Sequence, residues 1–382
     1  YAPNELPTSM KNALADGYVL FTRENGDYYC AGEGSHPLVH AMSRDRKNFG
    51  NKLSGTLFAN FTPIEGLVYT SRLGYNITDS NSYTYNKFFF ANQSKFNSEL
   101  NEVTRTNVTT TYYQWENFVN FDKTWGKHDF GVMAGISYSQ NDMTYLLGNI
   151  SKAIKDDPLF ADLRYVAGDA IRDADGFNQI NRKLSYFGRL NYDYKGRYLL
   201  EANLRYDGSS RFRAESRWIL TPSFSAGWNI AKEDFFRDLG TDINTLKLRV
   251  SYGMLANLNT NSPYPTYLTM TVSSKNGSWL QNGAKPNTAT VPGLISSSLT
   301  WESITTTNLG FDLAAFKNRL TGSFDYFWRK TTDMVGAGVE LPVILGTGVP
   351  STNNTDLTTM GWELSLGWRD VIGDFSYGAR IN

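Results

Sequence analysis

The residues best suited to catalysis or metal binding are few in this chain and far apart. It has three histidines, His36, His40 and His128, and a single cysteine, Cys30. No His-Glu-x-x-His motif is present, and no group of cysteines and histidines has the spacing of a zinc site. The sequence also lacks a Gly-x-Ser-x-Gly nucleophile motif and a phosphate-binding Walker loop. The sequence therefore predicts no metal site, no cofactor and no enzyme.

Two groups of carboxylates have ordinary explanations. The segment Asp173-Ala-Asp175-Gly176 begins like a calcium loop but lacks the remaining oxygen ligands, so a polar turn is favoured. Asp156 and Asp157 are adjacent, and capping of a short helix accounts for them better than acid–base catalysis. This helix is expected to begin at Pro158 and to stop at Gly168, with one apolar face made of Leu159, Leu163 and Val166.

Aromatic side chains are the better candidates for ligand contact. Tyr264, Tyr267 and Trp279 lie in a long polar stretch, where rings can stack on a sugar or grip a peptide. The alternative is that these rings pack against one another within the loop.

The elements that position such loops show an unusually clear period of two. The segments Lys183–Tyr194 and Tyr198–Asp207 alternate apolar or aromatic residues with charged ones, and a tight turn at Lys195–Gly196 joins them. This period marks strands that lie between two different environments. From Tyr198 to Tyr206 the strand spans about 27 Å, or about 20 Å along the membrane normal at a tilt of about 40°.

The same alternation recurs along most of the chain, and the connections alternate in length. Short turns are predicted at 63–66, 123–128, 195–196, 316–319 and 369–374, and long polar loops at 79–108, 141–182, 255–300 and 331–357. Short turns at one end and long loops at the other are typical of outer-membrane barrels. Loops of this length are unusual in a compact soluble domain. The predicted fold is therefore an all-β, transmembrane antiparallel β-barrel.

Composition agrees with this fold. The 382 residues include 37 basic and 37 acidic side chains and 14% aromatic residues, so no basic surplus favours nucleic acid. Mean hydropathy is −0.41, and no run approaches the roughly 18 apolar residues of a membrane helix. Residues 1–51 are expected to be an irregular region leading into the barrel, and residues 52–382 part of the barrel. Because Tyr1 is not an initiator methionine and the pattern stops at Asn382, we expect a piece of a longer chain.

The segment Phe187–Phe236 resembles the barrel of the SusC/RagA-type TonB-dependent outer-membrane transporters of the Bacteroidetes. Weaker similarities follow in the same order, among them 246–253, 301–312 and 361–364. The core of the resemblance is Arg205, Tyr206, Asp207, Gly208, Ser209, Ser210, Arg211 and Phe212, followed by Arg217-Trp218 and Ser225-Ala226-Gly227-Trp228.

The resemblance implies a barrel of about 22 strands in the bacterial outer membrane, surrounded by the lipid bilayer. It also implies an N-terminal plug, a SusD-like surface lipoprotein as a lid, energy supplied through the TonB protein, and an oligosaccharide or peptide as cargo. These residues depart from the family pattern by omission, since they contain no plug, no TonB-contacting segment and no aromatic-terminated last strand.

Two questions stay open at this point. Arg205, Asp207 and Arg211 are interpreted either as the polar wall that faces the barrel interior or as contacts to cargo. The leading function is nutrient import, and the alternatives are a passive porin or adhesin and an outer-membrane barrel hydrolase.

Overall fold

The computed structural model describes residues 44–87, 89–92, 95–97, 101–151, 161–165, 172–258, 260, 264–273, 277–290, 292–340, 342, 344 and 347–382. Cys30, His36 and His40 lie outside the described residues, as do Asp156 to Leu159, Val166 and Gly168 of the predicted short helix.

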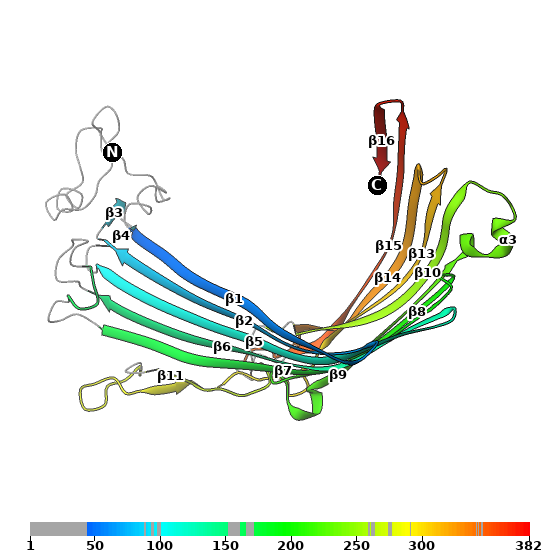
Figure 1. The fold of residues 1–382 in the computed structure, drawn as a ribbon. Coiled ribbons are helices and arrows are strands. Elements are labelled where there is room, and N and C mark those ends of the chain that lie inside the picture. The colour runs from blue at the N-terminus through cyan, green and yellow to red at the C-terminus, as the bar shows by residue number, and fades with distance from the viewer. Residues whose placement is uncertain are drawn as a thin grey trace, which may run out of the picture. The chain divides into compact units, whose positions relative to one another are not determined.

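Twelve strands form one sheet in which neighbours in space follow the chain order, β1-β2-β5-β6-β7-β8-β9-β10-β13-β14-β15-β16 (Figure 1). Two small ribbons, β3-β4 and β11-β12, stand apart from this sheet. Among the described residues, no helix is long and apolar enough to cross a membrane. The elements are β1 (Arg44–Ile64), β2 (Leu67–Asn86), β3 (Phe89–Asn92), β4 (Lys95–Asn97), β5 (Glu102–Trp125), β6 (His128–Ser151), β7 (Arg172–Tyr194), β8 (Tyr198–Ser209), η2 (Ala214–Ser216), β9 (Trp218–Asn229), η3 (Ile230–Lys232), α3 (Asp234–Arg237), β10 (Ile243–Asn257), β11 (Thr271–Ser273), β12 (Thr288–Thr290), β13 (Glu302–Ala315), β14 (Leu320–Ala337), β15 (Ser351–Ile372) and β16 (Phe375–Ile381).

The predicted short turns are confirmed. Tight connections join β1 to β2, β5 to β6, β7 to β8, β13 to β14 and β15 to β16. At the β7–β8 turn, Lys195 and Gly196 have φ angles of 55° and 62°. Two consecutive positive φ values give the turn that matches the right-handed twist of a hairpin, and glycine adopts such an angle without strain.

Three of the four predicted long loops are shorter than expected because the strands continue into them. Strand β2 runs to Asn86 and β5 begins at Glu102, whereas the sequence predicted a loop over 79–108. The loops predicted at 141–182 and 331–357 shrink in the same way, whereas the loop at 255–300 keeps nearly its predicted extent between β10 and β13. In these extensions polar residues occur on both faces between scattered apolar ones, so hydropathy no longer alternates cleanly although the strand continues. Threonine, a good strand former, is frequent in the first part of β5. Polar side chains also pair across these strands, since Asn149 donates hydrogen bonds to Glu102 (2.6 Å) and Thr104 (2.8 Å).

The segment Asp173–Gly176 lies inside strand β7, so the predicted polar turn and the calcium-loop interpretation are both wrong. Each aspartate accepts a hydrogen bond from the next backbone N–H, Asp173 from Ala174 (3.0 Å) and Asp175 from Gly176 (2.8 Å). No group of metal-binding side chains occurs in the described part of the chain.

Contacts divide the chain into two units. The first comprises Tyr1–Thr56, Gly74–Tyr113 and Gln140–Ile180, and the second comprises the rest. In the described residues of the first unit, a small buried core gathers Tyr85, Val103, Ile150 and Ala161, with Tyr83 and Leu163 packed against it.

The second unit has a sheet whose two faces differ in the predicted way. The side chains expected to face lipid are exposed on the isolated chain: Tyr198 is 43% exposed, Leu200 52%, Leu204 50% and Trp228 36%. Burial of these side chains in a globule would have contradicted a barrel. An outward apolar face backed by a polar one is the construction of a transmembrane barrel wall, and the predicted fold class is confirmed.

Candidate functional site

Asp207, near the end of β8, is a buried carboxylate that two strands hold in place. It is 5% exposed. The hydroxyl of Ser185, its partner across the β7–β8 ladder, donates a hydrogen bond to it. Arg205 donates from Nε to both carboxylate oxygens at 2.9 Å, and the Lys183 ammonium lies 3.6 Å away. These bonds neutralise the charge and hold the strand register, which favours the wall interpretation of Arg205 and Asp207.

Gly208 is required by an aromatic ring on the outward face. Its partner on β9 is Trp218. A Cβ atom at position 208 would lie 2.8 Å from the indole ring, so the ring occupies the space of the missing side chain. The same indole stacks on Tyr206, with ring centroids 4.8 Å apart and planes 17° apart. Residues 206 and 208 thus seat one ring of the aromatic girdle at this end of the strands.

The end of the signature anchors the loop that follows. Phe212 is fully buried, and its ring centroid lies 5.7 Å from that of Trp301. The indole of Trp301 donates to the carbonyl of Arg217 at 3.0 Å. Arg211 donates to the carbonyl of Leu258 at 3.3 Å, at the start of the predicted loop 255–300. Phe212 and Arg211 therefore position a loop, and they do so through burial and a backbone contact.

The loop aromatics are only partly brought together. The rings of Tyr264 and Tyr267 meet edge to face at 6.0 Å. The guanidinium of Arg213 lies 6.0 Å from the Tyr267 ring, and its Nε donates to the carbonyl of Thr266 at 3.2 Å. Trp279 is 61% exposed, and no ring contact joins it to the two tyrosines in the described part of the loop.

A second charged group lies on the polar face of β10, β13 and β14. Arg249 forms a two-pronged ion pair with Asp312, with both distances 2.9 Å. It also reaches Asp325 on β14 at 3.1 Å. Gly310 lies between Arg249 and Asp325 in the ladder, and a Cβ there would overlap the Asp325 carboxylate. Because Gly310 has no side chain, the Arg249 guanidinium reaches both carboxylates and connects β10, β13 and β14.

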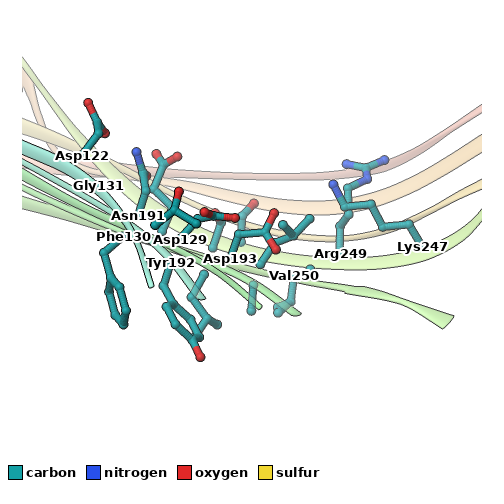
Figure 2. Close-up of a pocket in the computed structure, with 18 of the residues that line it drawn as sticks. Asp122, Asp129, Phe130, Gly131, Asn191, Tyr192, Asp193, Lys247, Arg249 and Val250 are labelled. Atoms are coloured by element: carbon teal, nitrogen blue, oxygen red, sulfur yellow. The ribbon is translucent and has the colours of Figure 1, made fainter. Parts of the chain in front are cut away.

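A hollow of about 610 Å³ is lined by strands β5 to β10. Figure 2 shows Asp122 and Asp129 on the same side of the sheet as Lys247 and Arg249, whereas the rings of Phe130 and Tyr192 extend from the opposite side. The polar face thus presents carboxylates from β5 and β6 and cations from β10. Such a surface suits a polar partner or a water-filled interior.

A third polar group closes the short-turn end of β8 and β9. Glu233, only 8% exposed, accepts hydrogen bonds from the Trp228 indole (3.0 Å) and the Arg197 guanidinium (3.1 Å). Hydrogen bonds from Tyr198 and Trp228 lower the pKa of the Glu233 carboxyl below its ordinary range. Arg197 also bonds Asp234 at 2.7 Å, so this residue connects the β7–β8 turn to α3.

The two-faced strands and the charged polar face define the wall of a membrane β-barrel. A family model described as "TonB dependent receptor-like, beta-barrel" matches residues 11–382, and the chain belongs to that family. Members of this family are outer-membrane proteins, which confirms the predicted location.

Known relatives agree with this family. The chain is 31% identical over 270 residues to the TonB-dependent receptor SusC of Bacteroides thetaiotaomicron, covering 69% of this chain and 26% of the relative. It is 30% identical over 283 residues to the TonB-dependent receptor P3 of Formosa agariphila, covering 74% and 27%. The RagAB peptide importer in its closed-closed state shares the fold, with a TM-score of 0.77, 22% identity and coverage of 94% of this chain and 40% of that one.

The chain spans about a quarter of the length of these curated relatives. The matches confirm the resemblance to SusC/RagA-type transporters. They also confirm that the chain is not an enzyme, since the relatives are receptors.

Sequence reasoning missed two groups of residues. The triad Arg249, Asp312 and Asp325 and the pair Arg197–Glu233 each join residues from different strands or turns. The alternation placed the triad on the polar face, but only the strand register shows that a glycine separates Arg249 from Asp325.

Proposed function

We propose that this chain is part of the barrel wall of an importer that takes up oligosaccharides or peptides across the outer membrane. The energy comes from the TonB protein, and a SusD-like lipoprotein covers the extracellular side. The observation that carries the proposal is the membership of residues 11–382 in a TonB-dependent receptor barrel family. The similarity to SusC, and the shared fold with a protein described as a peptide importer, support nutrient uptake as the activity.

Cargo contact is assigned to the loop aromatics. Tyr267 is 44% exposed and has the Arg213 guanidinium over its ring, and Trp279 is more exposed still. An exposed ring beside a cation presents an apolar face and a hydrogen-bond donor together, which suits the C–H face and hydroxyls of a sugar or the backbone of a peptide. Arg205 and Asp207 are engaged with each other and are assigned to the wall.

The test is uptake by cells that make the full-length protein, with a labelled oligosaccharide and a labelled peptide offered separately. We expect uptake of one of them, dependent on TonB. Trp279→Ala and Tyr267→Ala should each lower the apparent affinity about tenfold, the loss of one good aromatic contact. The matched control is Phe235→Ala, an exposed aromatic on α3 at the short-turn end, which should leave uptake unchanged.

The other functions give different results. A passive porin would let the solute through, and carry ionic current, equally well in cells without TonB. An adhesin would bind the solute or a surface without moving anything inward. Either result would contradict the proposed importer.

A further inference from the structure

The outward face of the second unit contains a hollow that ordinary alternation does not produce. It has a volume of about 810 Å³ and runs across β6 to β10, starting at His128. This volume is within the range of pockets that hold small molecules. Its floor is made of two small side chains, Ala202 and Ala226, in positions where the neighbouring outward-facing residues are large.

Strand register explains why the hollow forms at this place. Ala202 lies between Leu190 on β7 and Phe224 on β9 in one cross-strand row. Ala226 lies between Leu200 on β8 and Val250 on β10 in the next row. The two alanines are therefore diagonal neighbours, and together they form a lowered strip walled by leucine, valine and phenylalanine. An extended hydrocarbon chain fits such a strip.

One end of the hollow is polar and held in a defined shape. His128 packs against Tyr194 at 4.8 Å between ring centroids and against Tyr192 at 5.9 Å. Its Nδ1 is hydrogen-bonded to the Tyr192 hydroxyl at 2.8 Å. This bond orients the imidazole and leaves Nε2 as the ring atom directed to a further partner.

Two lysines flank this end. The backbone N–H of Lys195 donates to the carbonyl of Lys127 at 3.0 Å, so the β5–β6 and β7–β8 turns lie side by side. The Lys195 ammonium lies 5.3 Å from the Tyr194 ring, which is on the outward face, and the Lys127 side chain is exposed. The carboxylates of Asp122 and Asp129 project from the other face (Figure 2). Lys195 therefore places a positive charge on the outward side of these turns, and Lys127 adds an exposed ammonium in the adjoining turn.

We propose that this hollow is a specific binding site for a glycerophospholipid of the periplasmic leaflet. One acyl chain lies along Ala202 and Ala226, and the phosphate is held by Lys127, Lys195 and His128. Barrel hairpin turns of this short kind face the periplasm, which puts the cationic end at headgroup level. Lysines at a membrane surface attract anionic headgroups, and aromatic rings at that depth accommodate the interface.

The experiment uses the full-length protein in mild detergent and native mass spectrometry with added dioleoylphosphatidylglycerol. We expect one tightly retained lipid per protein, held more strongly than dioleoylphosphatidylethanolamine. Ala226→Phe fills the floor and should reduce retention about tenfold, which corresponds to the contacts of about two methylene groups. The control is Ala134→Phe, an exposed outward alanine on β6 outside the hollow, which should retain the lipid as the unmodified protein does.

A second variant tests the headgroup without touching the floor. Lys127→Gln combined with Lys195→Gln changes only exposed turn side chains, and it should abolish the preference for phosphatidylglycerol. Equal loss of lipid from the Ala226 and Ala134 variants would show non-specific annular lipid and overturn the proposal. An unchanged preference in the double lysine variant would overturn the assignment of the phosphate site.

Discussion

At position 208 the chain has no side chain, and the indole ring of Trp218 occupies the space where one would be. The neighbouring Asp207 turns to the polar face and binds Ser185 and Arg205. Asp207 and Gly208 are consecutive residues of the signature and lie on opposite faces of the sheet. Gly208 makes room for a ring on the outward face, and Asp207 provides a charge on the polar face. This division accounts for a signature that mixes glycine, acid and arginine in a single strand.

Replacement of Gly208 by alanine should destabilise the barrel because the new methyl group overlaps the Trp218 ring. We expect a loss of about 1–3 kcal/mol, typical of overpacking. The measurement is denaturant unfolding followed by tryptophan fluorescence. Gly253→Ala on β10 is the control, since its Cβ would lie 3.5 Å from Ser223, an ordinary contact. Equal effects of the two substitutions would contradict the role of the ring.

Among single residues, the sequence was informative where chemistry is local. The resemblance identified Arg205 to Phe212, and the alternation assigned Tyr206 to the apolar face and Arg205 and Asp207 to the polar one. It did not identify Arg249 as the centre of an ion-pair group, because Asp312 and Asp325 are distant in sequence and only strand register brings them within 3.1 Å. Cargo contacts also depend on how a long loop folds, and Tyr264, Tyr267 and Trp279 stay predictions.

Elements are joined at the short-turn end through Glu233. Its carboxylate accepts from Trp228 at the end of β9 and from Arg197 in the β7–β8 turn, and Arg197 continues to Asp234 of α3. A hairpin turn and the connection between β9 and β10 are thereby held by one buried acid.

Stability should depend on the protonation of this acid. Because the pKa of Glu233 is lower in the folded protein, its contribution is present at neutral pH and is lost as pH falls below about 4.3, the ordinary glutamate value. The melting temperature of the unmodified protein should exceed that of Glu233→Gln at pH 7, and the difference should shrink towards pH 3. Glu215→Gln, an exposed acid on η2, should show no such difference. A constant gap across pH would contradict the proposed linkage.

The sequence predicted strands well only where one face of the strand contacts lipid and the other contacts water. Lipid on one side and water on the other give the period of two in β8, and the predicted segment Tyr198–Asp207 agrees closely with the observed strand Tyr198–Ser209. Where polar residues occur on both faces of a strand, as in the first part of β5, hydropathy shows no clear period and the sequence predicts a loop. Hydrogen bonding between strands leaves no pattern of hydropathy in the sequence, so a strand held mainly by backbone pairing is not predicted.

On the scale of the whole molecule, the apolar outward face is the feature that requires a membrane. Leu204 lies on that face and is 50% exposed. Leu204→Arg should cost about 2–4 kcal/mol of folding free energy in a bilayer, the range for a basic residue on the lipid face near the midplane. The measurement is reversible unfolding of the full-length protein in phospholipid vesicles.

The control for this substitution is Ser225→Arg on the polar face of β9. Ser225 is exposed and lies opposite Glu201 in the ladder, so the new guanidinium finds water and a carboxylate. We expect a change of less than about 0.5 kcal/mol, as for ordinary surface substitutions. A similar cost at both positions would mean that the two faces meet the same solvent.

The gap at Gly310 has a mechanical consequence. The Arg249 side chain extends across β13 and binds carboxylates on β13 and β14. A register shift of two residues in the β10–β13 or β13–β14 pairing would move a carboxylate about 7 Å away and break an ion pair. Strands β10, β13 and β14 therefore resist sliding past one another. A force applied along any one of them is transmitted to the other two.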